Sequence, residues 1–417
     1  MSANVTSVAD GIYRLSANVY DILFEGLWPI PNGVAMNSYI VKGEKVAIVD
    51  GVCGWDGVPD TLFSQLDKMG IALTDIDYVV INHMEGDHSG WLADFKKIRG
   101  DDFTIVTTKR AVPLLEAFYD IPSLKVRTVA DGDTLDLGGR VLHFAEIPNV
   151  HWPETMATFD AMTGTLMSCD AFGSFGAVGD SPYDDQLSDT EVEFFANEVF
   201  RYYANIVATF SGATGRAIAK VESLIGDKLK IIAPGHGLVW RKNPQRILDL
   251  YKKCVQYHGG TAEPIVTVLW GSMYGNTEVA VPVAVQALRD AGLEVREFRV
   301  PQASLGDILA SAWVSTGIVL AMPTYEYKMF PPMAEAVGEL GRKHVQHRQA
   351  FRFGSFGWSG GAQKELDEIA ERYKLDWNFV EPVEFKGRPK EADLEAVRAG
   401  AALLAERVKA ALAASAA

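Results

Sequence analysis

The residues best suited to chemistry are four potential metal ligands that lie within six consecutive positions. They follow the apolar run 78–81 and are His83, Glu85, Asp87 and His88. The run is short, β-branched and bounded by polar residues, so it predicts a buried strand whose end holds the ligands in a loop. Neutral imidazole combined with carboxylate suits iron, zinc or manganese, and two carboxylates favour a site for more than one cation.

Three further candidate ligands come at the ends of other apolar runs, and these are His151, Asp170 and His236. Each alone has an ordinary explanation, such as a helix cap or a histidine satisfied in the core, and a solvated turn would account for a single His-X-Glu. The ends of successive strands can meet at one edge of a sheet, where a rigid scaffold holds side chains in fixed directions. All seven residues together therefore favour a metal site.

Composition describes a globular chain with more than one core. The 417 residues suggest two or three domains, and 48% hydrophobic with 22% charged residues is ordinary for a soluble protein. A net charge of −15 disfavours nucleic acid and anionic membrane surfaces as partners. The cysteines Cys53, Cys169 and Cys254 form no CxxC pair, which disfavours a thiolate-ligated iron site and favours a reducing compartment. The stretch 1–12 lacks a signal pattern and no run of 18 apolar residues occurs, so we expect a cytoplasmic protein with no membrane association.

The first part of the chain predicts mixed strands and helices. Gly43-Glu44 marks a hairpin, and Ser188 with Glu191 fits a capping box that opens a largely helical region reaching about residue 250. We expect strands over 11–15, 37–41, 45–50, 103–107 and 141–147 and helices over 58–69 and 111–119. The Gly-rich stretch 258–261 predicts a boundary between domains 1–260 and 261–417.

After residue 264 strands and helices alternate, which predicts a parallel sheet with helices on both faces. Pro282 fits the first helix only near its first turns or at a kink. The expected strands are 265–270, 293–300, 317–322, 350–356 and 383–385, and the expected helices include 276–291 and 391–414.

Three loops of this second sheet predict a flavin site. Small and hydroxyl residues after the first strand free backbone N–H groups to surround a phosphate, and the helix dipole adds attraction. Neither a P-loop lysine nor GxGxxG is present, so a phosphate monoester such as that of FMN fits best, with aromatic loops flanking a flat ring. Ordinary turns and surface aromatics are the alternative. The candidate residues are Ser272, Met273, Tyr274, Gly275, Asn276, Thr277, Pro323, Thr324, Tyr325, Glu326, Ser355, Gly357, Trp358, Ser359, Gly360 and Gly361.

Together these motifs resemble the flavodiiron proteins, also called A-type flavoproteins, over nearly the whole chain. The most specific element is His-X-Glu-X-Asp-His at 83–88, in which Glu85 replaces the histidine usual in zinc hydrolases of the same fold. The resemblance implies an α/β protein with a metallo-β-lactamase-like αββα sandwich followed by a flavodoxin-like doubly wound parallel sheet. It implies one iron held by His83, Glu85 and His151, another by Asp87, His88 and His236, and Asp170 as the bridge; the His88 position is not always a ligand in the family.

The resemblance further implies an enzyme that reduces O2 to water, NO to N2O, or both, at two non-haem iron ions that FMN refills with electrons. A rubredoxin-type donor or a deazaflavin-dependent route would supply the electrons, in a head-to-tail homodimer or a dimer of dimers. Phe24-Glu25-Gly26 departs from the common Phe-His-Gly, and Met36 precedes Asn37 in place of Tyr, so we expect a different substrate pocket. Two alternatives are a zinc-dependent hydrolase with an accessory flavodoxin domain and a redox carrier or sensor with a vestigial metal site.

Overall fold

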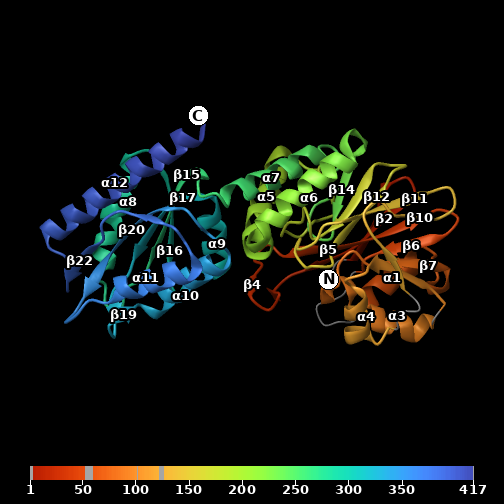
Figure 1. Ribbon diagram of the computed structural model, residues 1–417, viewed down its shortest axis with the longest axis horizontal. Helices are drawn as coiled ribbons and strands as arrows, with labels where there is room; N and C mark the ends of the chain where they lie inside the picture. Colours follow the sequence, from red (N-terminus) through yellow and green to blue (C-terminus); the bar gives the residue numbers. More distant parts are fainter. Residues whose placement is uncertain (1–2, 52–59, 101, 122–125, 417) are drawn as a thin grey trace. The chain divides into compact units, whose positions relative to one another are not determined.

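The structure is a computed structural model that describes residues 3–51, 60–100, 102–121 and 126–416. The chain forms two compact units, the first comprising Met1–Tyr202 and Phe210–Lys252 and the second Tyr203–Thr209 and Lys253–Ala417 (Figure 1). The second unit therefore takes over the chain at Lys253, ahead of the boundary that the Gly-rich stretch predicts after residue 260. None of the described helices is long and apolar enough to cross a membrane.

The first unit contains a seven-stranded sheet in the order β1-β2-β5-β6-β7-β8-β9. Its pairs are antiparallel from β1 to β6 and parallel from β6 to β9. The predicted hairpin at Gly43-Glu44 is confirmed, because Lys42 pairs with Val46. The strands are β1 Ala3–Ala9, β2 Ile12–Val19, β5 Val34–Lys42, β6 Val46–Val49, β7 Ile76–Val80, β8 Thr104–Thr108 and β9 Val126–Val129.

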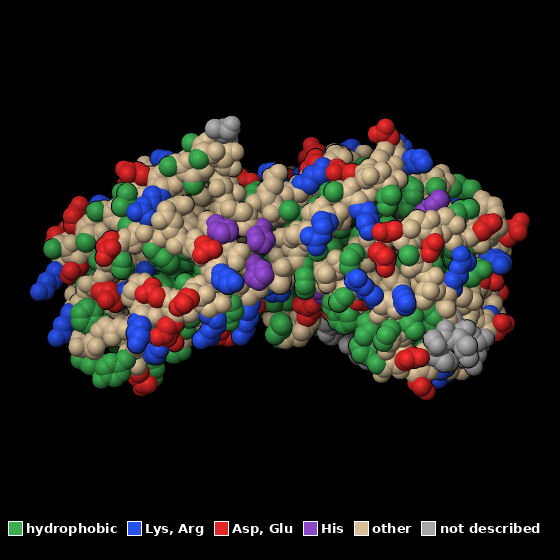
Figure 2. Space-filling model, viewed as in Figure 1, with side chains coloured by type: hydrophobic (Ala, Val, Ile, Leu, Met, Phe, Trp, Pro, Cys, Tyr) green, Lys and Arg blue, Asp and Glu red, His purple; other side chains and the backbone are tan. Residues whose placement is uncertain are grey.

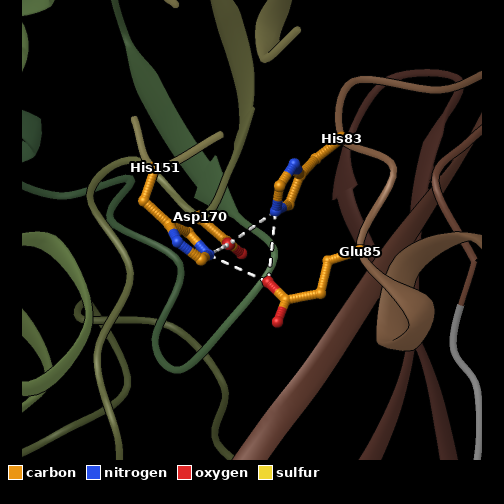
Figure 3. Close-up of side chains that lie close together, drawn as sticks. All are labelled: His83, Glu85, His151 and Asp170. Carbon is orange, nitrogen blue, oxygen red and sulfur yellow. Dashed lines mark hydrogen bonds and ion pairs between the residues drawn. The ribbon is translucent and has the colours of Figure 1, made fainter. Parts of the chain in front are cut away.

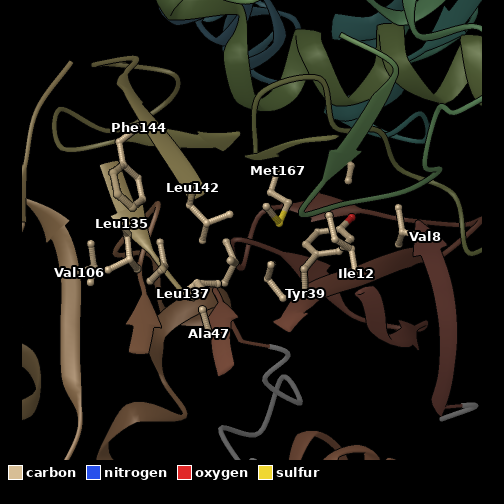
Figure 4. Close-up of a cluster of buried hydrophobic side chains, with 14 of the residues drawn as sticks. Val8, Ile12, Tyr39, Ala47, Val106, Leu135, Leu137, Leu142, Phe144 and Met167 are labelled. Atoms are coloured by element: carbon tan, nitrogen blue, oxygen red, sulfur yellow. The ribbon is translucent and has the colours of Figure 1, made fainter. Parts of the chain in front are cut away.

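A second sheet of five strands has the order β10-β11-β12-β13-β14. Its strands are β10 Thr134–Asp136, β11 Val141–Glu146, β12 Met156–Asp160, β13 Thr165–Cys169 and β14 Ile231–Pro234. Apolar side chains of both sheets share one core, in which Ile12 and Val106 lie in the same cluster as Leu142 (Figure 4). Removing this apolar surface from water is the main force that holds the two sheets together.

Helices cover the outer faces of both sheets. Successive strand residues point to opposite faces, and both faces carry apolar side chains, so the outer face must also be covered. Val80 and Val106 face the core between the sheets, whereas Val79 and Ile105 pack against the helices α1 Asp60–Lys68, α3 Leu92–Arg99 and α4 Val112–Tyr119. The opposite layer holds α5 Asp189–Tyr202, α6 Ser211–Leu224 and α7 Pro244–Tyr257 (Figure 1). This order of layers is the predicted αββα sandwich.

Local sequence signals predicted two helix starts in the first unit, and the structure describes only one of them in full. The capping box is confirmed, since Glu191 Oε2 accepts from the Ser188 backbone N–H at 2.8 Å and Ser188 Oγ from the Glu191 N–H at 3.4 Å. The predicted helix 58–69 is described from Asp60, and Val58, Pro59 and the cysteine Cys53 lie outside the described residues. Shorter elements are α2 Gly86–Ser89, the hairpin β3 Leu23–Phe24 and β4 Trp28–Pro29, the π-helix Tyr203–Val207, and 3₁₀ turns at Leu73–Asp75, Ala208–Phe210, Gly226–Lys228 and Glu278–Ala280.

The second unit has a wholly parallel sheet in the order β16-β15-β17-β20-β21, with β22 also pairing with β20. This is the 2-1-3-4-5 order of a flavodoxin-like doubly wound fold, as predicted. The strands are β15 Glu263–Trp270, β16 Glu294–Arg299, β17 Ser315–Ala321, β20 Gln349–Phe356, β21 Asn378–Phe379 and β22 Val383–Lys386.

Helices lie on both faces of this sheet (Figure 1). Val266 and Phe351 pack with residues of α8 Val281–Asp290 and α12 Glu391–Ala416, and the other helices are α9 Leu305–Val314, α10 Pro331–Arg342 and α11 Ala362–Tyr373. The helix predicted from residue 276 begins later, because 271–277 form an open loop before the 3₁₀ turn and α8. Pro282 occupies the first turn of α8, where its missing N–H costs nothing.

Candidate metal centre

The seven predicted ligands come from loops that meet at one edge of the sandwich. Asp170 and His236 follow the neighbouring parallel strands β13 and β14, whose last residues Cys169 and Pro234 are paired. The loop after β7 belongs to the other sheet, but Asn82 O accepts a hydrogen bond from the Met156 N–H at 2.9 Å and so joins the two sheets here. Parallel strands that end side by side therefore deliver residues far apart in sequence to one place.

Four of the ligands form a first group, drawn in Figure 3. Nε2 of His151 lies 2.9 Å from Glu85 Oε2 and 3.0 Å from Asp170 Oδ2. Nε2 of His83 lies 3.2 Å from Glu85 Oε2 and 3.3 Å from Asp170 Oδ2. All four potential ligand atoms lie within 4.8 Å of one another, close enough to surround one cation.

A second group combines Asp87, His88 and His236, whose ligand atoms also lie within 4.8 Å of one another. The other oxygen of Asp170, Oδ1, lies 2.8 Å from His88 Nε2 and 3.0 Å from His236 Nε2. Each oxygen of Asp170 thus faces a different group. A single carboxylate in this position could join two cations, and all seven predicted residues, His88 included, lie in one cluster with two parts.

Burial and charge act against one another at these residues. Burial alone lowers the pKa of His83, but the carboxylates of Asp170, Glu154 and Glu85 outweigh it and raise that pKa to about 10. The same competition raises the pKa of His236 to about 10. For Glu85 the two effects have the opposite signs: burial would raise the pKa of its carboxyl group, but the neighbouring histidines His151 and His83 lower it to about 2. Protons on the imidazoles therefore balance the buried carboxylates, and a metal cation would take the place of those protons.

The carboxylate of Asp87 is a further reason to expect a cation at this cluster. Within the described part of the chain both carboxylate oxygens of Asp87 are buried without a hydrogen bond, although Oδ2 lies 3.3 Å from His236 Nε2. A buried carboxylate without partners is costly, and a coordinated cation removes that cost. Four imidazole nitrogens beside carboxylate oxygens suit iron, zinc or manganese and not a thiolate-preferring ion.

Glu154 supports the centre although no spacing in the sequence predicted it. Its Oε1 lies 2.9 Å from His83 Nδ1 and accepts from the Met84 N–H at 3.0 Å. A carboxylate on the far nitrogen fixes the direction and the tautomer of an imidazole ligand, so Glu154 turns His83 Nε2 toward the centre. Glu154 is close to His151 in sequence, but only the fold reveals that it serves a different histidine.

Two aromatic side chains, Phe24 and Tyr202, form a wall beside His236. The ring of Phe24 lies 5.3 Å from the His236 ring in an edge-to-face arrangement, and the Tyr202 ring lies 5.8 Å from it. The Tyr202 hydroxyl is buried and makes no hydrogen bond to any residue that the structure describes. In the Phe24-Glu25-Gly26 segment it is thus the phenylalanine that touches a ligand, while the Glu25 carboxylate accepts from Trp28 Nε1 at 3.0 Å.

Met36 and Asn37 act on the same loop through the backbone and the side chain. Met36 forms a β-bridge with His236, and Asn37 Nδ2 donates to the carbonyls of Pro234 and Gly237, each at 3.0 Å. The residues that flank His236 are therefore held by β5. Met36, where the sequence departs from the family pattern, therefore lies next to a predicted ligand, and its effect on the pocket stays a prediction.

In the second unit, the three predicted cofactor loops follow β15, β17 and β20 at the carboxyl edge of the sheet. Thr277 Oγ1 and Ser355 Oγ lie 3.0 Å apart, which joins the first loop to the third. A Cβ on Gly361 would lie 2.1 Å from Tyr327 O, so only glycine allows the third loop to approach the second. Tyr327, which sequence reasoning missed, lies with its ring 6.1 Å from that of Trp358.

Aromatic side chains of these loops are unusually open to solvent. Tyr274 is 90% exposed and Trp358 is 72% exposed, and Tyr325 is also exposed. Rings that are not packed against the protein leave their faces free for another flat group. Thr324 Oγ1, by contrast, is buried with no hydrogen-bond partner among the described residues.

Known proteins resemble this chain over most of its length. A family model described as "ODP family beta lactamase" matches residues 34–237. An anaerobic nitric oxide reductase flavorubredoxin from Aliivibrio salmonicida is 33% identical over 362 residues, which is 85% of this chain and 69% of that protein.

Solved structures agree with this relationship. Rubredoxin oxygen:oxidoreductase from Desulfovibrio gigas superimposes with a TM-score of 0.90 and 28% identity, covering 98% of this chain and 100% of that one. The flavodiiron protein from Giardia intestinalis gives a TM-score of 0.89 with 26% identity and covers 99% of this chain and 98% of that one. The likeness covers both units, and with the 33% identity to the flavorubredoxin it shows that the chain belongs to the flavodiiron protein family.

Proposed function

We propose that this chain is a flavodiiron oxidoreductase that reduces O2, NO or both at two non-haem iron ions, with electrons relayed by FMN. The observation that carries the proposal is Asp170, whose two oxygens each face a separate group of imidazole and carboxylate donors. The names of the relatives support both substrates, since one is a nitric oxide reductase and another an oxygen:oxidoreductase.

The residues of the centre have distinct tasks in this proposal. His83, Glu85 and His151 would hold one iron, Asp87, His88 and His236 the other, and Asp170 would bridge them. Iron bound there would supply the electrons for reduction of a diatomic molecule, and FMN held by the loops of the second unit would replace them. The buried carboxylates offset the added positive charge of the oxidised ions, which favours repeated cycling.

Residues around the centre would set the tautomer of His83 and limit the access of water to His236. Glu154 holds His83 in the tautomer that presents Nε2. Phe24 and Tyr202 shield the His236 side from water, and the unpaired Tyr202 hydroxyl is available to donate a hydrogen bond to a small polar substrate. The same shielding lowers the local dielectric constant and so strengthens each electrostatic contact within the pocket.

FMN would be held by the loops after β15, β17 and β20. The phosphate would lie against 272–277, where Ser272, Asn276 and Thr277 would supply hydroxyl and amide groups beside backbone N–H groups of the loop. Tyr325 and Trp358 would flank the ring. The other residues predicted for these loops remain a prediction for this chain: Met273, Tyr274, Gly275, Pro323, Thr324, Glu326, Ser355, Gly357, Ser359, Gly360 and Gly361.

Partners and location form part of the same proposal. A rubredoxin-type donor is supported by the name of the Desulfovibrio gigas relative. A head-to-tail homodimer, or a dimer of dimers, would bring one subunit's FMN to the other subunit's irons. A cytoplasmic location is supported by the described cysteines, Cys169 and Cys254, which are both buried and free.

The deciding experiment measures O2 and NO consumption in parallel, using iron-loaded and FMN-loaded protein with reduced rubredoxin. We expect consumption of at least one gas well above the rate of free FMN, together with about two iron ions per chain by metal analysis. Zinc without iron, or gas consumption no faster than that of free flavin, would refute the proposal. Diluting the protein to monomers tests the dimer, because turnover should then stop while both cofactors stay bound.

A further inference from the structure

One of the chain's three cysteines, Cys169, lies beside the candidate metal centre, although neither of the two ligand groups described above includes it. Its sulfur, an imidazole nitrogen of His88 and a carboxylate oxygen of Asp170 all lie within 4.8 Å of one another. All three side chains are buried, and Cys169 is free of disulfide bonds. A sulfur atom is therefore within reach of a cation at this centre, in addition to the nitrogen and oxygen donors.

The backbone at the end of β13 explains how two consecutive residues reach the same site. In a regular strand the side chains of Cys169 and Asp170 would point to opposite faces of the sheet. Cys169 instead has a φ of +50°, in the left-handed region, and the pairing of β13 with β14 shifts register between Met167 and Cys169. Such an irregularity can turn a side chain toward a new direction, so the cysteine and the aspartate both face His88.

The loop after β14 keeps His88 close to this strand end. A Cβ on Gly235 would lie 2.8 Å from His88 Cε1 and 3.2 Å from the carbonyl carbon of Cys169. The Gly235 N–H also donates to Cys169 O at 2.6 Å. Because it has no side chain, Gly235 lets the loop contact both the His88 ring and the Cys169 backbone, and so the imidazole and the thiol are held near one another.

The charges around Cys169 favour a cation. The carboxylates of Asp50, Asp87 and Asp170 all lie near its thiol. Both oxygens of Asp87 are buried and find no hydrogen-bond partner among the described residues, and Oδ2 lies 3.4 Å from His88 Nε2, which independently indicates a ligand at this place. On the face of the molecule in Figure 2, by contrast, acidic and basic side chains are interspersed. Buried carboxylates gathered beside a thiol are stabilised by a bound cation.

Sulfur changes which cation such a donor set prefers. Thiolate is a soft ligand, and Zn²⁺ binds mixed sets of cysteine, histidine and aspartate with tetrahedral geometry. Cd²⁺ is softer than Zn²⁺ and favours thiolate still more strongly. The first group, of His83, Glu85, His151 and Asp170, offers only nitrogen and oxygen, so this preference applies to the part of the centre that contains His88. When a cation binds to the sulfur, the thiol proton is released to solvent.

We propose that Cys169, His88 and Asp170 form an alternative donor set in the candidate metal centre, which binds one thiolate-preferring divalent cation such as Zn²⁺ in place of an iron ion. Both ions need His88 and Asp170, so they exclude one another. Zn²⁺ has no redox chemistry and cannot pass electrons, so its binding inhibits the enzyme until the ion is removed. The competition with iron rests on the proposed function, whereas binding to the sulfur does not.

The test is a Cd²⁺ titration of the metal-free, full-length protein, because cadmium bound to a thiolate has a charge-transfer absorption in the ultraviolet. We expect this absorption in the unaltered protein and its loss in C169S and in C169A, which remove the sulfur. The matched control is C254S, which alters the other described cysteine, also buried and free, and should keep the full absorption. A cooperative thermal unfolding transition shows that each variant is folded. Absorption that persists in folded C169S or C169A, or that is absent from the unaltered protein, would overturn the proposal.

A second measurement tests the competition with iron. Zn²⁺ is added to iron-loaded protein, and the released iron is measured together with the remaining gas consumption. We expect C169S to need at least about tenfold more Zn²⁺ than the unaltered protein for the same release, since even an indirect partner of a metal ligand changes affinity by that factor. Equal release from both proteins would overturn the competition. If the protein takes up no iron, the proposed function fails, but the cadmium absorption still decides whether Cys169 is a ligand.

Discussion

The candidate metal centre and the candidate flavin loops differ in how far their side chains are buried. In the first unit His83, His88 and His236 are almost wholly buried, and their charges are balanced by carboxylates within about one hydrogen-bond length. In the second unit Tyr274 and Trp358 are mostly exposed and have few contacts. A centre of charged ligands must be preorganised because desolvation is costly, whereas loops that stack on a flat ring can stay open until it arrives.

The largest effect should come from breaking the shared carboxylate. In D170N the amide can no longer offer a negative oxygen to each ligand group, so we expect loss of iron from both and turnover reduced more than about 100-fold. Iron analysis and gas consumption measure this. The matched control is D184N, since Asp184 is a buried carboxylate that accepts backbone N–H groups near Lys242 instead. Full iron content in D170N would contradict the bridging role.

A smaller effect should follow when only the orientation of one ligand is disturbed. E154Q replaces the carboxylate beside His83 Nδ1, and we expect iron affinity to fall about 10- to 100-fold, the usual effect of such a partner. A competitive chelator titration measures the affinity. E198Q changes a buried carboxylate elsewhere and should leave it unchanged. If E154Q bound iron as tightly as the unaltered protein, Glu154 would be only a structural residue.

In the open loops a single substitution should matter less. W358A removes one flanking ring, and we expect FMN affinity to fall by about 0.5–1.5 kcal/mol, or about 2- to 12-fold, while iron content stays the same. Fluorescence titration with FMN gives the affinity. F118A, which removes an exposed aromatic ring of the first unit, is the control. A loss of iron in W358A would show that the two regions are not independent.

The smallest effect on stability should come from Tyr202. Its hydroxyl is buried and finds no hydrogen-bond partner in the described residues, so Y202F removes a polar group that gains nothing from them in the folded state. We expect the free energy of unfolding to stay within about 1 kcal/mol of the original, or to rise. Urea denaturation measures it. A marked destabilisation would mean that the hydroxyl has a hydrogen-bond partner in solution, such as an ordered water molecule.

Local sequence patterns were sufficient for most elements and for the candidate ligands. Alternation and β-branching predicted the strands before His83, Asp170 and His236, because a buried strand needs a continuous apolar run. The capping box at Ser188 predicted a helix start for an equally local reason. The short strand β21, the delayed start of α8 and the role of Tyr327 were missed, because each depends on contacts made by distant residues.

By itself, the sequence determined which residue types end the strands and therefore which chemistry was available, since ligand identity and apolar runs are local properties. Only the tertiary structure decided that Asp170 faces two groups at once, that Glu154 serves His83, and that Phe24 and Tyr202 stand beside His236. Those relations join segments brought together when two sheets pack face to face. Packing of that kind depends on the whole core, and no short stretch of the chain encodes it.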